Sequence, residues 1–236
     1  MTKLKGWKTL KDDGRSELVL AVDFATTGRS DSSFSDLAPR LGGPVAVWET
    51  RQPADGANLT AAGYLDLWAA EVTASGREVR AVLGYCAGSM FAGELAARIA
   101  ERQGSAPALV VFDPEPPTPA SLYRDFDAMM NQFASLLSPD EVAAAQAEGT
   151  AARDGAHDFA TCGAELVRVF GAHAGSAFAR AELDADMLDE FTDVFRSFVS
   201  YLDAARQLDP AQAWADATAV SSRTPTEGAK LAARVV

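Results

Sequence analysis

The sequence predicts an α/β fold: a mostly parallel sheet flanked by helices, with a helical insertion. Two observations carry this prediction. In the first half of the chain, short apolar runs alternate with segments of helical periodicity, which is typical of parallel βαβ units. From Pro119 to about Leu208, by contrast, no segment has the pattern of a strand and the apolar residues keep helical spacing.

Short apolar runs predict the strands of this sheet. The run Leu18–Val22 is continuously apolar, as expected of a strand that is buried on both faces of a parallel sheet. The other predicted strands are an edge strand at Gly6–Leu10 and the segments Pro44–Trp48, Val79–Leu83, Ala108–Phe112, Ala217–Ser221 and Leu231–Val236.

Amphipathic segments predict the helices. Those between the strands are Phe34–Leu41, Leu59–Ser75 and Met90–Arg102; those of the insertion are Ser121–Leu137, Pro139–Glu148, Asp154–Gly171 and Asp186–Leu208. The last of them has the strongest apolar stripe, which favours burial in a core. We therefore expect one domain, with a core of about residues 1–118 and 209–236 and a helical lid of about residues 119–208.

Composition excludes several classes of function. A net charge of −12 over 236 residues argues against a general nucleic-acid-binding protein. The N-terminus lacks a signal-peptide pattern, and no apolar run reaches the roughly 18 residues that span a bilayer. Two cysteines do not make a disulfide framework, so we expect a cytoplasmic protein without a membrane partner. The sequence has neither paired His/Cys spacing for zinc nor a Gly-rich phosphate loop, and we expect no metal or cofactor.

The segment Gly84-Tyr85-Cys86-Ala87-Gly88 has the pattern of a nucleophile elbow. It lies between a predicted strand and a predicted helix, where a sharp turn lifts one side chain above an α/β sheet. The positions two before and two after the nucleophile must be small, and Gly84 and Gly88 meet that need. Cys86 is therefore the candidate nucleophile, at a position where serine is the common choice.

Asp113 is the candidate acid. It follows the predicted strand Ala108–Phe112 directly and comes 27 residues after Cys86, which leaves room for one helix and one strand. Both side chains should then project from the carboxyl edge of the sheet, where ligands of α/β proteins bind.

At these residues the chain resembles the thioesterases of polyketide and non-ribosomal peptide assembly lines. The resemblance rests on the Cys86 elbow, on the segment Phe112–Pro117, which is similar to the family's acid motif, and on Ser32–Ala38, which is similar to its first helix. It implies an α/β-hydrolase fold with a helical lid and substrates carried on the phosphopantetheine of an acyl or peptidyl carrier protein. It also implies an oxyanion hole made by the N–H groups of Ala87 and Thr27.

The sequence departs from this family in its histidine. The family places a catalytic histidine after the last strands, whereas His157 and His173 both fall in the predicted lid. Three explanations are open: the given chain lacks a C-terminal segment, a lid histidine serves instead, or the triad has decayed and the protein binds acyl groups without turning them over. Neither histidine is assigned a catalytic role here.

A cysteine nucleophile has chemical consequences. A thiol is a few per cent ionised at neutral pH even without help, and its acyl adduct is a thioester that water, an amine or a hydroxyl can attack. The sequence thus indicates a thioesterase or acyltransferase that acts through a covalent Cys86 intermediate, by hydrolysis, transfer or cyclising release. Two alternatives are a dienelactone-hydrolase-like cysteine esterase, which shares Gly-Tyr-Cys but lacks a long lid, and a catalytically silent acyl- or carrier-binding module.

Overall fold

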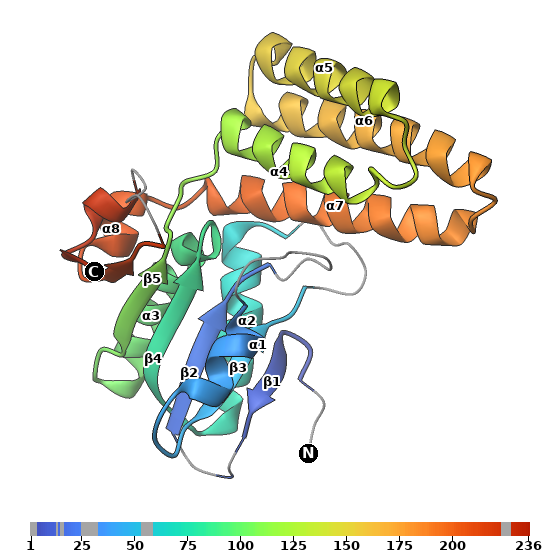
Figure 1. The fold of residues 1–236 in the computed structure, drawn as a ribbon. Coiled ribbons are helices and arrows are strands. Elements are labelled where there is room, and N and C mark those ends of the chain that lie inside the picture. The colour runs from blue at the N-terminus through green and yellow to red at the C-terminus, as the bar shows by residue number, and fades with distance from the viewer. Residues whose placement is uncertain (1–3, 13, 15–16, 25–32, 53–58, 223–227) are drawn as a thin grey trace. The chain divides into compact units, whose positions relative to one another are not determined.

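A computed structural model describes residues 4–12, 14, 17–24, 33–52, 59–222 and 228–236 (Figure 1). The chain divides into two compact units. The first, called the sheet unit, comprises Met1–Pro116 and Ala204–Val236. The second, called the helical unit, comprises Pro117–Asp203 and is inserted into the sheet unit in chain order.

The described residues of the sheet unit form one sheet of seven strands in the order β1-β3-β2-β4-β5-β6-β7. Only β1 is antiparallel to its neighbour, so the predicted, mostly parallel α/β architecture is confirmed. The strands are β1 (Trp7–Lys11), β2 (Glu17–Val22), β3 (Ala46–Thr50), β4 (Glu78–Tyr85), β5 (Ala108–Phe112), β6 (Thr218–Val220) and β7 (Arg234–Val235).

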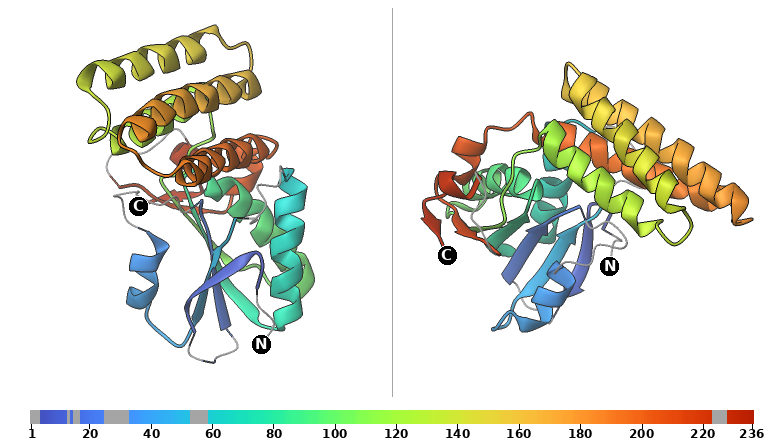
Figure 2. Two further views of the ribbon diagram at one scale, coloured as in Figure 1. Left: turned by 90° about the vertical axis from the view of Figure 1, so that its right-hand side faces the viewer. Right: turned by 45° about the horizontal axis from the view of Figure 1, so that its top comes forward.

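Helices cover both faces of this sheet. Figure 2 shows α1 on one side of the strands and α2 and α3 on the other. The helices of the unit are α1 (Phe34–Leu37) with the 3₁₀ turn η1 (Ala38–Arg40), α2 (Ala61–Ser75), α3 (Gly88–Gln103), α8 (Pro210–Trp214) and the 3₁₀ turn η2 (Gly228–Leu231). On the α1 face the buried core includes Val19, Val47 and Leu83, whereas Tyr85 and Phe112 are only partly buried there.

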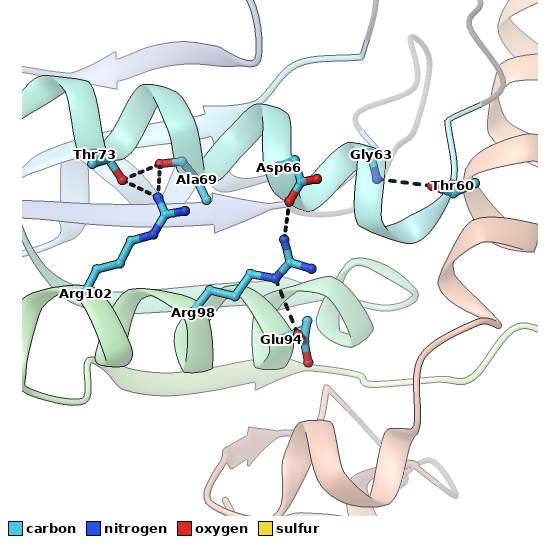
Figure 3. A network of polar contacts seen from close by, with 8 residues as sticks. All are labelled: Thr60, Gly63, Asp66, Ala69, Thr73, Glu94, Arg98 and Arg102. Carbon is cyan, nitrogen blue, oxygen red and sulfur yellow. Dashed lines mark hydrogen bonds and ion pairs between the residues drawn. The ribbon is translucent and has the colours of Figure 1, made fainter.

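Aromatic and polar contacts join α2 to α3. The rings of Tyr64 and Trp68 both pack edge-on against Phe91, with ring centroids 5.6 and 5.4 Å from its own. At the surface, Arg98 of α3 bonds Asp66 of α2 at 2.6 Å and Glu94 at 3.4 Å (Figure 3). Exposed ion pairs of this kind contribute little, so the buried rings carry most of the attachment.

The helical unit consists of α4 (Pro119–Gln132), α5 (Pro139–Gly155), α6 (Phe159–Arg180) and α7 (Ala185–Ala205). Side-chain caps begin three of these helices: Thr118 for α4, Ser138 for α5 and Asp158 for α6. Phenylalanine rings fill the space between the helices. The ring centroids of Phe133 and Phe170, for example, lie 5.7 Å apart. In the described part of the chain, no helix is both long and apolar enough to cross a membrane.

Several predicted boundaries are wrong, for identifiable reasons. The segment predicted as the helix Asp154–Gly171 divides differently: α5 runs on to Gly155, and α6 begins only after its cap Asp158, whose carboxylate accepts the Thr161 N–H at 2.7 Å. The α6 helix then continues through Gly171, which lies inside the helix, to Arg180.

Two short elements also differ from the prediction. The predicted helix Phe34–Leu41 is α-helical only to Leu37 and then tightens into η1, in keeping with the missing N–H of Pro39. Helix α8 was not expected, because five residues are too few to show a period; Asp209 caps it by accepting the Ala211 N–H at 2.9 Å.

One exposed ion pair fastens the start of α5 to the end of α6. Arg180 donates from both terminal nitrogens to Glu141, at 2.6 and 3.1 Å, and the Ser138 N–H donates to the same carboxylate at 2.7 Å. The Arg180 hydrogen bonds, followed by those from Ser138, lower the pKa of Glu141 from 4.5 to about 2.

This depressed pKa predicts how the stability of the helical unit depends on pH. Since the folded state holds the Glu141 proton less tightly than the unfolded chain, the contribution is present above pH 4.5 and is lost as pH falls toward 2. The variant Glu141→Gln should therefore lower the melting temperature more at pH 6 than at pH 3, measured by circular dichroism. Asp140→Asn, one residue away, serves as the control for charge removal. Equal losses at the two pH values would contradict the assignment.

Candidate active site

Cys86 stands in a strained turn between β4 and α3. Its φ is +49°, in the left-handed region that costs a residue other than glycine about 1–3 kcal/mol. The turn is held by a hydrogen bond from the Cys86 N–H to the Phe112 carbonyl at 2.9 Å. The Cys86 carbonyl also accepts two bonds from Ser89, one from its N–H at 3.1 Å and one from its hydroxyl. This geometry is what the elbow pattern predicts.

Gly84 makes the turn possible. A Cβ built at Gly84 would lie 2.5 Å from the Ser89 Cα and 2.8 Å from the Ala92 Cβ, closer than real atoms come. The strand therefore passes against the first turn of α3 with no room for any side chain. This contact brings the N-terminus of α3 directly behind Cys86.

The N-terminus of α3 supplies hydrogen-bond donors beside Cys86. Ala87 is the cap residue of this helix and is buried. Among the residues that the structure describes, none accepts a hydrogen bond from the Ala87 N–H. Such N–H groups and the helix dipole favour negative charge close to the turn.

Asp113 occupies a second left-handed turn, at the end of the next strand. Its φ is +42°, a conformation that aspartate tolerates better than most residues. Its N–H donates to the Val220 carbonyl at 2.9 Å, and its Oδ1 accepts the Ser222 N–H at 2.8 Å. Within the described part of the chain no donor reaches its Oδ2.

The sheet register places these two turns side by side. Strands β4 and β5 are parallel neighbours, and Tyr85 lies opposite Phe112 in the register. Cys86 and Asp113 are the next residues of the two strands, and the bond from the Cys86 N–H to the Phe112 carbonyl joins the turns. As predicted, both project from the carboxyl edge of the sheet.

A cavity of about 300 Å³ lies beside Asp113, between α1 and the ends of β4, β5 and β6. Its walls are mixed: apolar rings and chains alternate with carboxylates and one guanidinium. The described lining residues are Asp23, Ser33, Phe34, Asp36, Leu37, Arg40, Tyr85, Phe112, Asp113, Val220 and Ser222. Cys86 itself is not among them, although Tyr85 directly precedes it.

Two aspartates line this cavity in different surroundings. Asp23 is buried at the end of β2, where its carbonyl accepts the Thr50 hydroxyl at 2.7 Å. Asp36 lies at the surface in the capping box of α1, and the hydroxyl and N–H of Ser33 hold its pKa below the usual range. The cavity can thus accept a ligand with both apolar and hydrogen-bonding groups.

The histidines and the second cysteine lie in the helical unit. His157 is exposed and pairs with Asp158 at 3.2 Å, and His173 is bonded to Glu148 at 3.2 Å. Cys162 is fully buried in α6, and burial raises the pKa of its thiol, which makes it a poor nucleophile. The sequence of the sheet unit contains no histidine, so the unit that carries Cys86 and Asp113 has no imidazole of its own.

The structure thus brings together Cys86, Ala87 and Asp113, while Thr27 lies outside the described residues. Sequence reasoning missed Asp23 and Ser222. Asp23 carried a usable signal, because it directly follows the apolar strand that ends at Val22. Ser222 carried no such signal, because it contacts Asp113 through its backbone N–H and not through its side chain. The described residues contain no group of three or more side chains suited to hold a metal ion.

Comparison with known proteins supports the fold. No protein-family model matches the chain, and no curated protein sequence matches it. One solved structure similar to this chain is the thioesterase domain of Vlm2, with genetically encoded 2,3-diaminopropionic acid and a bound dodecadepsipeptide. The two sequences are 14% identical, the match covers 99% of this chain and 88% of that chain, and the TM-score is 0.55. Another is MGS-M2, an α/β hydrolase from a Medee basin deep-sea metagenome library. It is 11% identical, the match covers 98% of this chain and 84% of that chain, and the TM-score is 0.53. The expected α/β-hydrolase fold is confirmed.

The contact at Gly84 yields a prediction. The variant Gly84→Ala should lose about 3 kcal/mol of folding stability, because its methyl group would overlap the backbone of α3. The matched control is Gly63→Ala in α2, where the nearest atom lies 3.5 Å from the added carbon and alanine favours the helix. Urea denaturation of both variants measures the difference, and equal midpoints would show that the close approach is not a constraint.

Proposed function

We propose that the protein is a thioesterase or acyltransferase that forms a covalent acyl intermediate on Cys86. The observation that carries this proposal is the strained turn at Cys86, beside the Ala87 N–H and joined to the turn of Asp113. A residue other than glycine is held at positive φ only where the surrounding contacts enforce it, and such positions cluster at functional sites. A buried structural thiol would need no such turn.

The first step would be transfer of the acyl group to Cys86. The Sγ thiolate attacks the carbonyl carbon of a thioester, and the carbonyl electron pair moves to its oxygen. The Ala87 N–H stabilises that oxyanion, a contribution of roughly 3 kcal/mol for a preorganised donor. When the intermediate collapses, the bond to the carrier sulfur breaks and the leaving thiolate takes a proton. Since one thioester replaces another, the step is close to thermoneutral.

The second step would release the acyl group to water, an amine or a hydroxyl. The attacking group loses a proton and the Cys86 thiolate leaves. Asp113 suits the orientation of a proton acceptor in this step, because Ser222 holds its Oδ1 and its Oδ2 receives no bond from the described residues. We assign neither His157 nor His173 as that acceptor; each pairs with a carboxylate of its own helical unit.

The likeness of the fold and the cavity both support a class of substrate. The Vlm2 domain is described as a thioesterase domain with a bound depsipeptide, which supports an acyl or peptidyl chain delivered on a carrier protein as the substrate of this chain too. A cavity of about 300 Å³ with apolar and polar walls would accept part of such a chain. No resident cofactor is needed, because the phosphopantetheine arrives with the carrier.

Intact-protein mass spectrometry tests the covalent step. When the protein is mixed with a hexanoyl-pantetheine thioester, the mass should increase by one hexanoyl group. The increase should be absent in Cys86→Ala and preserved in Cys162→Ala, because the Cys162 thiol is fully buried.

The outcomes separate the candidate functions. An adduct that persists shows that Cys86 is the nucleophile and that release is slow in this chain; thioester consumption without an adduct shows that release is fast. If the wild type neither gains mass nor consumes the thioester, the enzymatic proposal fails. Equilibrium binding of the thioester without turnover would then favour the silent binding module.

A further inference from the structure

Trp214, the last residue of α8, contacts the segment that holds Cys86. Its indole is fully buried, and its Nε1–H donates to the Ser89 carbonyl at 2.9 Å. A buried indole needs such a partner, since Nε1–H is a donor only. Ser89 lies in the first turn of α3, so this bond reaches into the helix N-terminus behind Cys86.

Ser89 is in turn hydrogen-bonded to Cys86. Its hydroxyl and its N–H both donate to the Cys86 carbonyl, and Ser89 is itself fully buried. The Trp214 indole therefore holds Ser89 by its backbone carbonyl, and the N–H and hydroxyl of Ser89 hold the carbonyl of the strained turn. The turn that fixes Cys86 is thereby anchored to a residue more than a hundred positions later in the chain.

The other edge of the same ring lies against Gly228, which in turn lies against Pro114. A Cβ built at Gly228 would come within 2.6 Å of the Trp214 Cζ3 and within 2.3 Å of the Pro114 carbonyl oxygen. The backbone of Gly228 is therefore pressed between the ring and Pro114, the residue that follows Asp113. The rigid Trp214 side chain is thus bonded to the backbone near Cys86 and packed against Gly228, which touches the backbone next to Asp113.

We propose that Trp214 is a positioning residue that holds the Cys86 turn in place relative to the Asp113 turn. This inference rests on the proposed function only in taking Cys86 as the nucleophile. Without the indole bond, Ser89 loses one of its fixed contacts, and the helix N-terminus that favours the Cys86 thiolate is held less tightly. Small displacements of this kind reduce reaction rates strongly even when the fold persists.

The test measures the rate at which iodoacetamide alkylates Cys86, by peptide mapping, between pH 6 and pH 9. We expect Trp214→Phe to slow alkylation at pH 7 roughly three- to tenfold and to move the half-maximal rate to higher pH. Ser89→Ala should act in the same direction. The double variant should be slowed by less than the product of the two single effects, because both changes weaken the hold of Ser89 on the Cys86 turn.

Trp68→Phe is the matched control. Trp68 is as buried as Trp214, but no described residue accepts a hydrogen bond from its Nε1, so the same substitution should leave Cys86 alkylation unchanged. Cooperative thermal melting of each variant shows that the rates refer to folded protein.

Three results would overturn the proposal: wild-type rate and pH dependence in Trp214→Phe, additive effects in the double variant, or, if Trp214→Phe does not fold, a wild-type rate in Ser89→Ala. Because alkylation needs no thioester, it answers this question even if hexanoyl-pantetheine fails to acylate Cys86.

Discussion

The close contact between β4 and α3 is the constraint on which the rest of the site depends. Gly84 lets the strand touch the backbone of Ser89, and this contact forces the chain to reverse within the residues between them. Cys86 is therefore held in a left-handed backbone conformation. Its cost is offset by the hydrogen bonds of its N–H and carbonyl, which also bring the donors of the helix N-terminus next to the thiol.

The same device is repeated one strand further along the sheet. Asp113 also ends its strand in a left-handed conformation, and its N–H also bonds the carbonyl of the neighbouring strand. The order of the parallel strands therefore determines the positions of the site residues. The Cys86 N–H is bonded to β5, and the Asp113 N–H is bonded to β6. Two polar residues 27 positions apart in the sequence are thereby placed at the ends of neighbouring strands.

Much of this arrangement could be predicted from the sequence. The spacing of Gly84, Cys86 and Gly88 indicated the turn, and the position of Asp113 after an apolar run indicated the acid, because both patterns are local. The bond from Ser222 and the packing of Trp214 could not be predicted. They join residues more than one hundred positions apart, and one of them uses only a backbone N–H, which has no signature in sequence. The predicted end of α5 and the predicted length of α6 were wrong because a glycine is a weak signal for a helix end: α5 passes through Gly149 and α6 through Gly171.

The insertion of the helical unit between β5 and β6 has a consequence for the order of folding. Phe112 pairs with Val220 across that insertion, so the pairing must close a loop of roughly a hundred residues, at an entropic cost that grows with loop length. The contacts of a helical unit are mostly local, and such units form quickly. A helical unit that folds first leaves only a short gap to close, and the turn of Asp113, which depends on β6, is completed last.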